Sequence, residues 1–316
     1  MDIIGIGRAV KDFLITINEM PPQDSHTALN DYSSQGGGKV SSAMIAAARL
    51  GMETAMYGVI GDDSKGRFIS EDFKRHGTDT SHLIVDKGTK NTFCICVAEK
   101  VSQTRRFFGE SGTARDLTVE DLDYNFLKKA RAIHLDSGNA VARKAAQFAK
   151  SSNILVSMDA DQYREELEEM EALTDIFIAS EFYYEGRCRS MSHRELCCEM
   201  AGKGCRVAMI TLGSKGCVGV ADGEYFELPA FKNVNVIDTT GAGDIFHGAY
   251  LSAYLKGLGA VESATFASAV SAIKCTRIGG RAGIPDWDTT LHFLKNGEIL
   301  SEELDRRVKF YRELVV

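Results

Sequence analysis

The stretch from Asp238 to Gly248 has small residues and an acid at a spacing suited to chemistry on an anion. It reads Asp-Thr-Thr-Gly-Ala-Gly-Asp-Ile-Phe-His-Gly, and the apolar residues that follow recur at helical spacing. We therefore expect a helix to begin near Gly241. The first amide N–H groups of a helix lack partners within it, and small residues let a ligand approach them closely. Together with the helix dipole, these amides form an anion site.

Asp244 lies in the first turn of this expected helix. One interpretation is structural, because an acid in the first turn stabilises the helix dipole. The other is catalytic, because a carboxylate beside a bound phosphate can take the proton of an attacking hydroxyl. The structural interpretation explains Asp244 alone and leaves the glycines around it unexplained. Val234, Val236 and Ile237 predict a strand before the turn, so the site would lie between a strand and a helix.

The same residues resemble the C-terminal signature of the ribokinase (PfkB) family of carbohydrate kinases, and the resemblance extends over nearly the whole chain. In that family the amides of Gly-Ala-Gly-Asp hold the transferring phosphate, and the aspartate is the catalytic base. The resemblance gives the amide role to Gly241, Ala242 and Gly243, and the role of the base to Asp244.

A second signature runs from Gly37 to Gly51, reads Gly-Gly-Lys-Val-Ser-Ser-Ala-Met-Ile-Ala-Ala-Ala-Arg-Leu-Gly and opens an expected helix. It is similar to the N-terminal motif of the family, in which a glycine pair lets the backbone pass close to a sugar. Ser42 stands where the family most often has Asn. Asp12 matches an aspartate that binds sugar hydroxyls. The sugar-binding residues implied in this way are Asp12, Asp24, Gly37, Gly38, Lys39 and Ser42.

Other matched positions concern phosphate, nucleotide and cations. Arg105 lies on an expected strand and matches an arginine that reaches the transferred phosphate. The glycine-rich segment 277–283 is expected to close over adenine, and Ser180-Glu181-Phe182-Tyr183 stands where the family usually has Asn-x-x-Glu, a motif of its magnesium network. The resemblance implies ATP and Mg²⁺ as cofactors. It gives nucleotide binding to Thr211, Gly213, Ser214, Gly216 and Gly280, and a monovalent cation such as K⁺ to Asp238 and Thr240.

The segment from Lys274 to Pro285, together with His247, looks most like the sulfofructose kinase and fructose kinase branch. An arginine of that branch is replaced by Ser137 and Gly138. The function implied is ATP-dependent phosphorylation of a primary hydroxyl of a ketohexose, either fructose or sulfofructose. The alternatives are a nucleoside or sugar-acid kinase of the same fold, and a non-catalytic sugar-binding homologue, which the altered Asn-x-x-Glu favours.

Composition limits the partners of the chain. Its 316 residues carry a net charge of −7 and are 44% hydrophobic, which permits a large core and argues against nucleic acid or a membrane surface as a partner. We find no apolar run of about 18 residues and no signal-peptide pattern. Eight cysteines without a C-x-x-C pair indicate free thiols in the cytoplasm.

Strands and helices alternate from Arg131 onward, which predicts a mainly parallel sheet covered by helices. The glycines near Ile4 do not mark a dinucleotide site, because the next segment, Phe13 to Ile17, is extended rather than helical. No P-loop pattern occurs. The resemblance implies one ribokinase-like three-layer α/β domain over residues 1–316, with strands of a small lid sheet at about 12–35 and 90–110. Exposed lid edges favour a homodimer paired through the lid.

Overall fold

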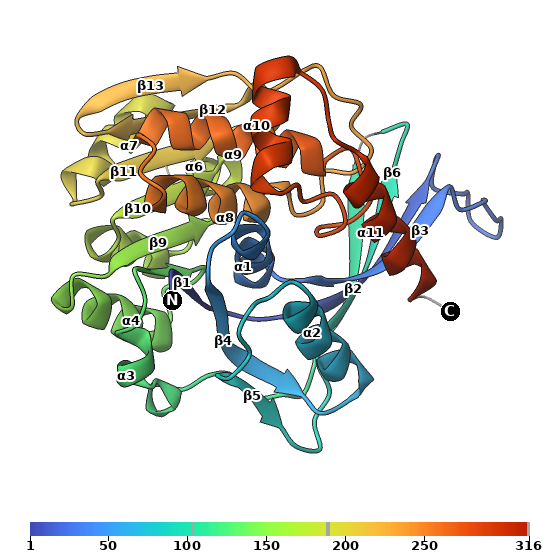
Figure 1. Cartoon of the computed structure of the whole chain (residues 1–316), viewed down its shortest axis with the longest axis horizontal. Helices are drawn as coiled ribbons and strands as arrows, with labels where there is room; N and C mark the ends of the chain where they lie inside the picture. The colour runs from blue at the N-terminus through green and yellow to red at the C-terminus, as the bar shows by residue number, and fades with distance from the viewer. Residues whose placement is uncertain (103, 188–189, 315–316) are drawn as a thin grey trace.

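A large sheet lies at the centre of the chain (Figure 1). The computed structural model describes residues 1–102, 104–187 and 190–314. Within them the sheet has nine strands, in the spatial order β13 (Glu224–Leu228), β12 (Cys217–Ala221), β11 (Val207–Thr211), β10 (Ile176–Ser180), β9 (Leu155–Ala160), β8 (Ala132–Leu135), β1 (Ile3–Ile6), β4 (Thr54–Gly61) and β5 (Leu83–Asp86). Neighbours from β11 to β5 are parallel, whereas β12 is antiparallel to β11 and to β13.

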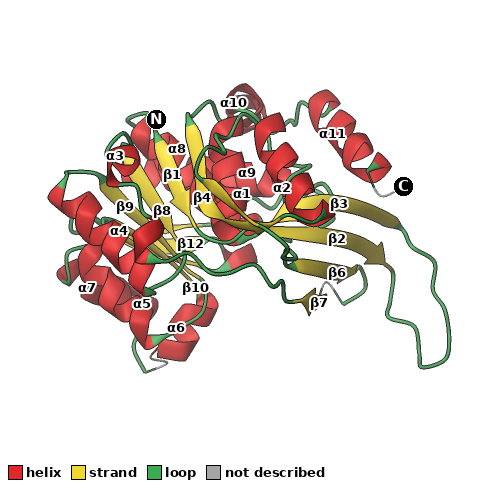
Figure 2. Cartoon of the chain, turned by 90° about the horizontal axis from the view of Figure 1, so that it is seen from below, coloured by secondary structure: helices red, strands yellow, loops and turns green. Residues whose placement is uncertain are grey.

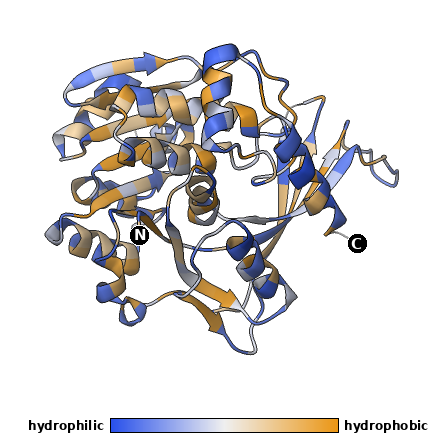
Figure 3. Ribbon diagram, viewed as in Figure 1, coloured by the Kyte–Doolittle hydropathy of each residue, from blue (hydrophilic) through white to orange (hydrophobic). Residues whose placement is uncertain are grey.

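Helices cover both faces of this sheet, and alternate strand residues enter two separate apolar cores. Ile3 packs with one set of helices and Ile4 packs on the opposite face with the other. Strands buried on both faces are typical of a parallel sheet between helical layers, and Figure 3 shows their apolar colouring. The first set is α1 (Lys39–Arg49), α2 (Ser64–Arg75), α8 (Ala242–Leu255) and α9 (Ala260–Lys274); the second is α3 (Tyr124–Leu127), α4 (Ala140–Ser151), α5 (Glu165–Met170), α6 (Glu181–Arg187) and α7 (His193–Gly202). The predicted layered α/β architecture is confirmed.

A smaller sheet projects from one side of the large one (Figure 2). Its order is β3 (Asp31–Gly37), β2 (Val10–Ile17), β6 (Phe93–Glu99) and β7 (Arg105–Glu110). All residues of β7 are exposed, whereas β3 is buried from Ser33 to Gly37. Residues 18–30 form the loop that joins β2 to β3. We call the four strands the lid sheet.

The strand expected at Val234, Val236 and Ile237 does not form. Val236 is 53% exposed and Ile237 is 41% exposed, so these apolar side chains do not enter a sheet. The backbone N–H of Ile237 donates instead to the carbonyl oxygen of Cys275 at 2.8 Å. The turn before α8 is therefore held by the end of α9 and not by a strand ladder.

The C-terminal helix is α11 (Glu302–Glu313), and it follows α10 (Trp287–Asn296). The many charged residues of 301–314 predict a surface helix, yet Leu304, Arg307 and Tyr311 are buried. The Tyr311 hydroxyl donates to Asp72 on α2 at 2.6 Å. Polar residues between these positions concealed a stripe that packs against the protein. None of the helices described here has the length and apolar character needed to cross a bilayer.

Candidate active site

The residues predicted to form an anion site, 241–244, lie at the start of α8. Gly241 is the N-cap residue and has φ 72°, a left-handed conformation that favours glycine. A Cβ added at Gly241 would lie 3.1 Å from Cα of Gly280, so the neighbouring backbone also limits side-chain size. A Cβ at Gly243 would meet no heavy atom within 4 Å. The first turn of α8 therefore opens toward space in which an anion can reach its amides.

Asp244 belongs to a cluster of carboxylates around one lysine. A Cβ at Gly241 would lie 3.7 Å from Asp244 Oδ2, so this carboxylate lies beside the anion site. Burial, and then the charge of Asp159, raise the pKa of Asp244 to about 7. Asp136, Asp159, Asp161 and Asp244 together raise the pKa of Lys39, although its burial acts in the opposite direction. A carboxylate with a pKa near neutrality is suited to accepting a proton from an alcohol.

His247 balances part of this negative charge. Its Nε2 lies 3.4 Å from Asp159 Oδ1, and both side chains are buried. Burial raises the pKa of Asp159, but the neighbouring His247 outweighs it and holds that pKa at about 2. Asp159 is therefore charged over the whole physiological range, and its charge keeps a proton on Asp244 until higher pH.

Sequence reasoning missed Asp136, Asp159 and Asp161 as site residues. Asp136 directly follows β8, Asp159 is near the end of β9, and Asp161 directly follows β9. Ligands of open α/β sheets bind beyond the carboxyl ends of the strands. Both strands were predicted, so acids at these ends were the signal available in the sequence.

The glycine pair before α1 is explained by two buried side chains. A Cβ on Gly37 would collide with the carboxylate of Asp12, and a Cβ on Gly36 would collide with the guanidinium of Arg281. Burial raises the pKa of Asp12 to about 6, and the charge of Arg281 limits that rise. Asp12 is thus held against the backbone that leads into Gly38 and Lys39, where the predicted sugar site lies.

Close packing of α1 on α8 joins the two predicted signatures. A Cβ at Gly248 would collide with the carbonyl of Ala43, so glycine is needed where the helices touch. Gly38, with φ 96°, precedes the first turn of α1 and Lys39 begins it. Ser42 is buried, and its Oγ would lie 4.0 Å from a Cβ at Gly280. The segments predicted to bind sugar and phosphate are therefore neighbours in space.

Asp24 is placed differently from the other predicted sugar ligands. It lies in the exposed 18–30 loop with φ 58°. This loop extends beyond the far end of the lid sheet in Figure 2. The chain as described does not bring Asp24 to Asp12.

A cavity of about 1280 Å³ borders the start of α8. Arg105 of the lid sheet lines it together with Ala242 and Gly243. The turn after β11 contributes four of the predicted nucleotide-binding residues, which are Thr211, Gly213, Ser214 and Gly216. The segment 234–239 and the end of α9 form another wall. This volume is ample for a nucleotide.

The glycine-rich segment 277–283 is not a wall of this cavity. Its residues from Ile278 to Gly283 are buried, and Gln35 of β3 holds them. Gln35 Oε1 accepts from the backbone N–H of Arg281 at 2.8 Å, and its Nε2 donates to the carbonyl of Ile278 at 3.0 Å. Gly280 therefore packs against Gly241, and the closure of this segment over adenine stays a prediction.

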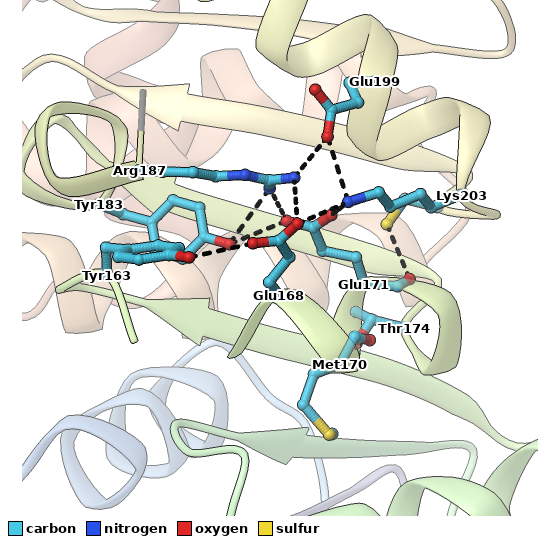
Figure 4. A network of polar contacts seen from close by, with 10 residues as sticks. Tyr163, Glu168, Met170, Glu171, Thr174, Tyr183, Arg187, Glu199 and Lys203 are labelled. Carbon is cyan, nitrogen blue, oxygen red and sulfur yellow. Dashed lines mark hydrogen bonds and ion pairs between the residues drawn. The ribbon is translucent and has the colours of Figure 1, made fainter. Parts of the chain in front are cut away.

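The residues at the Asn-x-x-Glu position have structural roles. Ser180 Oγ accepts from the backbone N–H of Tyr183 at 3.2 Å and caps α6. The Tyr183 hydroxyl donates to buried Glu171 at 2.8 Å, in a network with Arg187 and Lys203 (Figure 4). Tyr183 therefore points into a packed ionic cluster and does not replace a carboxylate at the cavity.

Asp238 and Thr240, expected to hold a monovalent cation, are both buried. The Nζ of Lys274 donates to the carbonyl oxygens of both residues. Among the residues described, no group of three or more His, Cys, Asp or Glu is arranged to hold a metal ion.

The pKa of Asp244 predicts a pH dependence of turnover. A general base acts only when it is ionised. If Asp244 has the predicted role of the base, kcat/KM should be low in acid, rise through about pH 7 and level off above it. The Asp159→Asn variant should move this midpoint to lower pH, since Asp159 is a charge that raises it. A pH profile of kcat/KM for both proteins checks this prediction. A midpoint that stays unchanged in the variant would contradict it.

Comparison with known proteins agrees with this geometry. A nucleoside kinase from Methanothermobacter thermautotrophicus is 26% identical over 293 residues, covering 90% of this chain and 93% of that protein. Fructokinase-1 from Zea mays is 26% identical over 310 residues, covering 90% and 94%. In fold, the chain resembles a fructokinase with bound ATP from Xylella fastidiosa, with a TM-score of 0.78, 20% identity and coverage of 94% and 99%. The family model of pfkB family carbohydrate kinases matches residues 2–287. The chain belongs to the pfkB family of carbohydrate kinases.

Proposed function

We propose that this kinase transfers the γ-phosphate of ATP to a primary hydroxyl of a ketohexose, with Asp244 as the general base. The observation that carries the proposal is the position of the Asp244 carboxylate. It lies beside Gly241, at the first turn of a helix that opens at Gly243 into a nucleotide-sized cavity. One acid and one anion site side by side are what in-line phosphoryl transfer to an alcohol requires.

In this proposal the chain positions the reactants and accepts one proton. The turn after β11 and the wall 234–239 hold the nucleotide, so that its terminal phosphate reaches the amides of residues 241–243. Asp12, Gly37, Gly38, Lys39 and Ser42 hold the sugar. Asp244 takes the hydroxyl proton as the oxygen attacks, while Arg105 and the amides stabilise charge on the phosphoryl oxygens. Mg²⁺ commonly binds one or two carboxylates together with phosphates. Asp161, 43% exposed and close enough to raise the pKa of Asp244, fits that role.

The charge of the pocket favours an unmodified ketohexose over an anionic one. Lys39 is surrounded by four carboxylates, and Arg8 is paired with Asp116 at 2.6 Å. Arg281 is buried in an ion pair with Asp72. Each of these three cations already has acidic neighbours within the chain. An anionic acceptor would face net negative charge, which is repulsive in a partly buried site.

A substrate screen tests this assignment. ADP release would be measured with fructose, sulfofructose, ribose, ketodeoxygluconate and adenosine at matched concentrations. We expect the highest kcat/KM with fructose and values at least about tenfold lower for the two anionic sugars, the effect of roughly 1.4 kcal/mol of repulsion. A preference for sulfofructose or ketodeoxygluconate would contradict the charge argument, while no turnover with any acceptor would favour the non-catalytic alternative.

A nucleoside kinase is the second candidate, supported by one observation of the structure. Phe107 and Phe108 of the lid sheet are 59% and 52% exposed, and aromatic side chains can stack on a base. The nucleoside kinase relative fits the same interpretation. Turnover of adenosine above that of fructose in the same screen would decide for it.

Exposed β7 also supports our proposal of a homodimer paired through the lid sheet. An uncovered strand edge beside two exposed phenylalanines is a surface that a second lid can cover. Light scattering that finds only monomer at micromolar concentration would contradict this proposal.

The seven described cysteines are free thiols, which supports a cytoplasmic location; Cys188 lies outside the described residues.

Substitution of Arg105 tests whether this arginine, and not its neighbour Arg106 on the other face of β7, contacts the phosphate. Arg105→Ala should lower kcat/KM for ATP by roughly 10–100-fold, because one charge-assisted hydrogen bond to phosphate contributes about 1.5–3 kcal/mol. Arg106→Ala is the matched control, since Arg106 lies 3.8 Å from Glu99 in an ion pair of its own. Steady-state kinetics with varied ATP measure both. Equal losses in the two variants would contradict a phosphate contact specific to Arg105.

A further inference from the structure

Lys274 is a buried amine that the proposed mechanism leaves without a role. It is the last residue of α9, and its side chain is fully buried. Burying an ammonium group costs several kcal/mol unless polar partners surround it. We therefore expect polar groups around Lys274 that stabilise its buried charge.

Its partners are backbone carbonyl oxygens and not a carboxylate. Lys274 Nζ donates to the carbonyl of Asp238 at 2.9 Å and to the carbonyl of Thr240. The carboxylate of Asp238 is occupied separately, by the backbone N–H of Thr240 at 2.8 Å and of Gly279 at 2.8 Å. Burial raises the pKa of Asp238, but the Lys274 charge and these N–H groups bring it below its usual range. The Lys274 ammonium group is therefore held by the carbonyl oxygens of Asp238 and Thr240.

This contact fixes the direction of an amide in the anion site. A peptide group is planar and its C=O and N–H point in opposite directions. The carbonyl of Thr240 belongs to the same peptide group as the N–H of Gly241. When Lys274 draws that carbonyl toward itself, the Gly241 N–H points away from Lys274, on the side of the bound phosphate in the proposed function.

A K⁺ ion does not fit at Asp238 and Thr240 in this chain. Their carbonyl oxygens already bind an ammonium group, and a second cation on the same oxygens would be placed against it in a buried site. We propose that Lys274 is a tethered cation that orders the 238–241 turn, so that this kinase needs no monovalent cation. Lys274 is then a positioning residue, and the inference rests on the phosphate-binding role proposed for residues 241–243.

A K⁺ titration of the unchanged enzyme is the first test. With ionic strength held constant by tetramethylammonium chloride, kcat should not respond to K⁺. Activation by K⁺ that saturates would overturn the proposal, because it would show a cation site that Lys274 does not fill.

Two substitutions of Lys274 form the second test. Lys274→Ala removes the cation and leaves room, whereas Lys274→Met removes the charge and fills the space. Both should lower kcat about 10²-fold, the usual cost of a misplaced catalytic group. K⁺, ammonium or methylammonium should restore much of the activity of the alanine variant and none of that of the methionine variant. Lys256→Ala, at the exposed end of α8, is the control and should behave like the unchanged enzyme.

Thermal melting gives a readout without substrate. K⁺ should raise the Tm of Lys274→Ala and leave the Tm of the unchanged protein and of Lys274→Met where they are. An alanine variant with full activity, or one that no cation rescues in activity or in Tm, would overturn the proposal. If the unchanged protein phosphorylates no acceptor, the proposed function fails, while the Tm comparison still tests Lys274 as a cation.

Discussion

Asp244→Asn is expected to lower kcat on the order of 10²–10⁴-fold while nucleotide affinity stays close to that of the unchanged enzyme. Asparagine keeps the shape of aspartate but cannot accept the hydroxyl proton. The amides at the start of α8 and the cavity beside them remain as they are, so the nucleotide keeps its contacts. Single-turnover phosphorylation measures the chemical step, and titration with an ATP analogue measures affinity.

The matched control is Asp288→Asn. Asp288 is also an acid in the first turn of a helix, α10, and it lies outside the proposed site. If Asp244 only stabilises its helix, the two variants should have equal, small effects. A kcat of Asp244→Asn within about threefold of the unchanged enzyme would contradict the assignment of the base.

The same variant should be more stable than the unchanged protein at alkaline pH. The folded pKa of Asp244 is about 7, above that of an unfolded aspartate, so the folded state holds its proton more tightly. Stability contributed by this proton is present in acid and is lost as pH rises through about 7. The Asp244→Asn variant has no such proton to lose. The Tm of the variant should therefore exceed that of the unchanged protein above about pH 7 and approach it in acid.

Gly243→Ala is expected to reduce kcat/KM about 10²–10³-fold, as does the loss of an oxyanion-hole contact. The added methyl group would extend into the space where we place the terminal phosphate. It meets no protein atom within 4 Å and Gly243 does not have a positive φ, so folding should not suffer. Alanine also has a higher helix propensity than glycine.

Gly202→Ala is the control for this substitution. Gly202 is likewise helical, in α7, and a Cβ there also meets nothing within 4 Å. Both variants should melt at or above the temperature of the unchanged protein, and only Gly243→Ala should lose activity. If both retain activity, the terminal phosphate does not lie against Gly243.

The sequence by itself determined the features that depend on neighbouring residues. The helix starts after Gly241 and after Gly38 are local, because glycine and helical periodicity act within a few positions. The alternation of strands and helices also predicted the parallel, helix-covered sheet. Asp244 could be proposed as the base because the glycines of the motif adjoin it in the chain.

The tertiary structure decided whatever depends on residues that are distant in sequence. The apolar segment 234–237 lines a cavity, although its side chains are typical of a strand, and the N–H of Ile237 bonds to Cys275 at the end of α9. Asp136, Asp159 and Asp161 become one cluster because parallel strands end at the same edge. Lys274 looks like an ordinary helix-terminal lysine in the sequence. Its ammonium group reaches the carbonyl oxygens of Asp238 and Thr240 only because α9 packs against the 238–241 turn. Local propensity does not encode this contact.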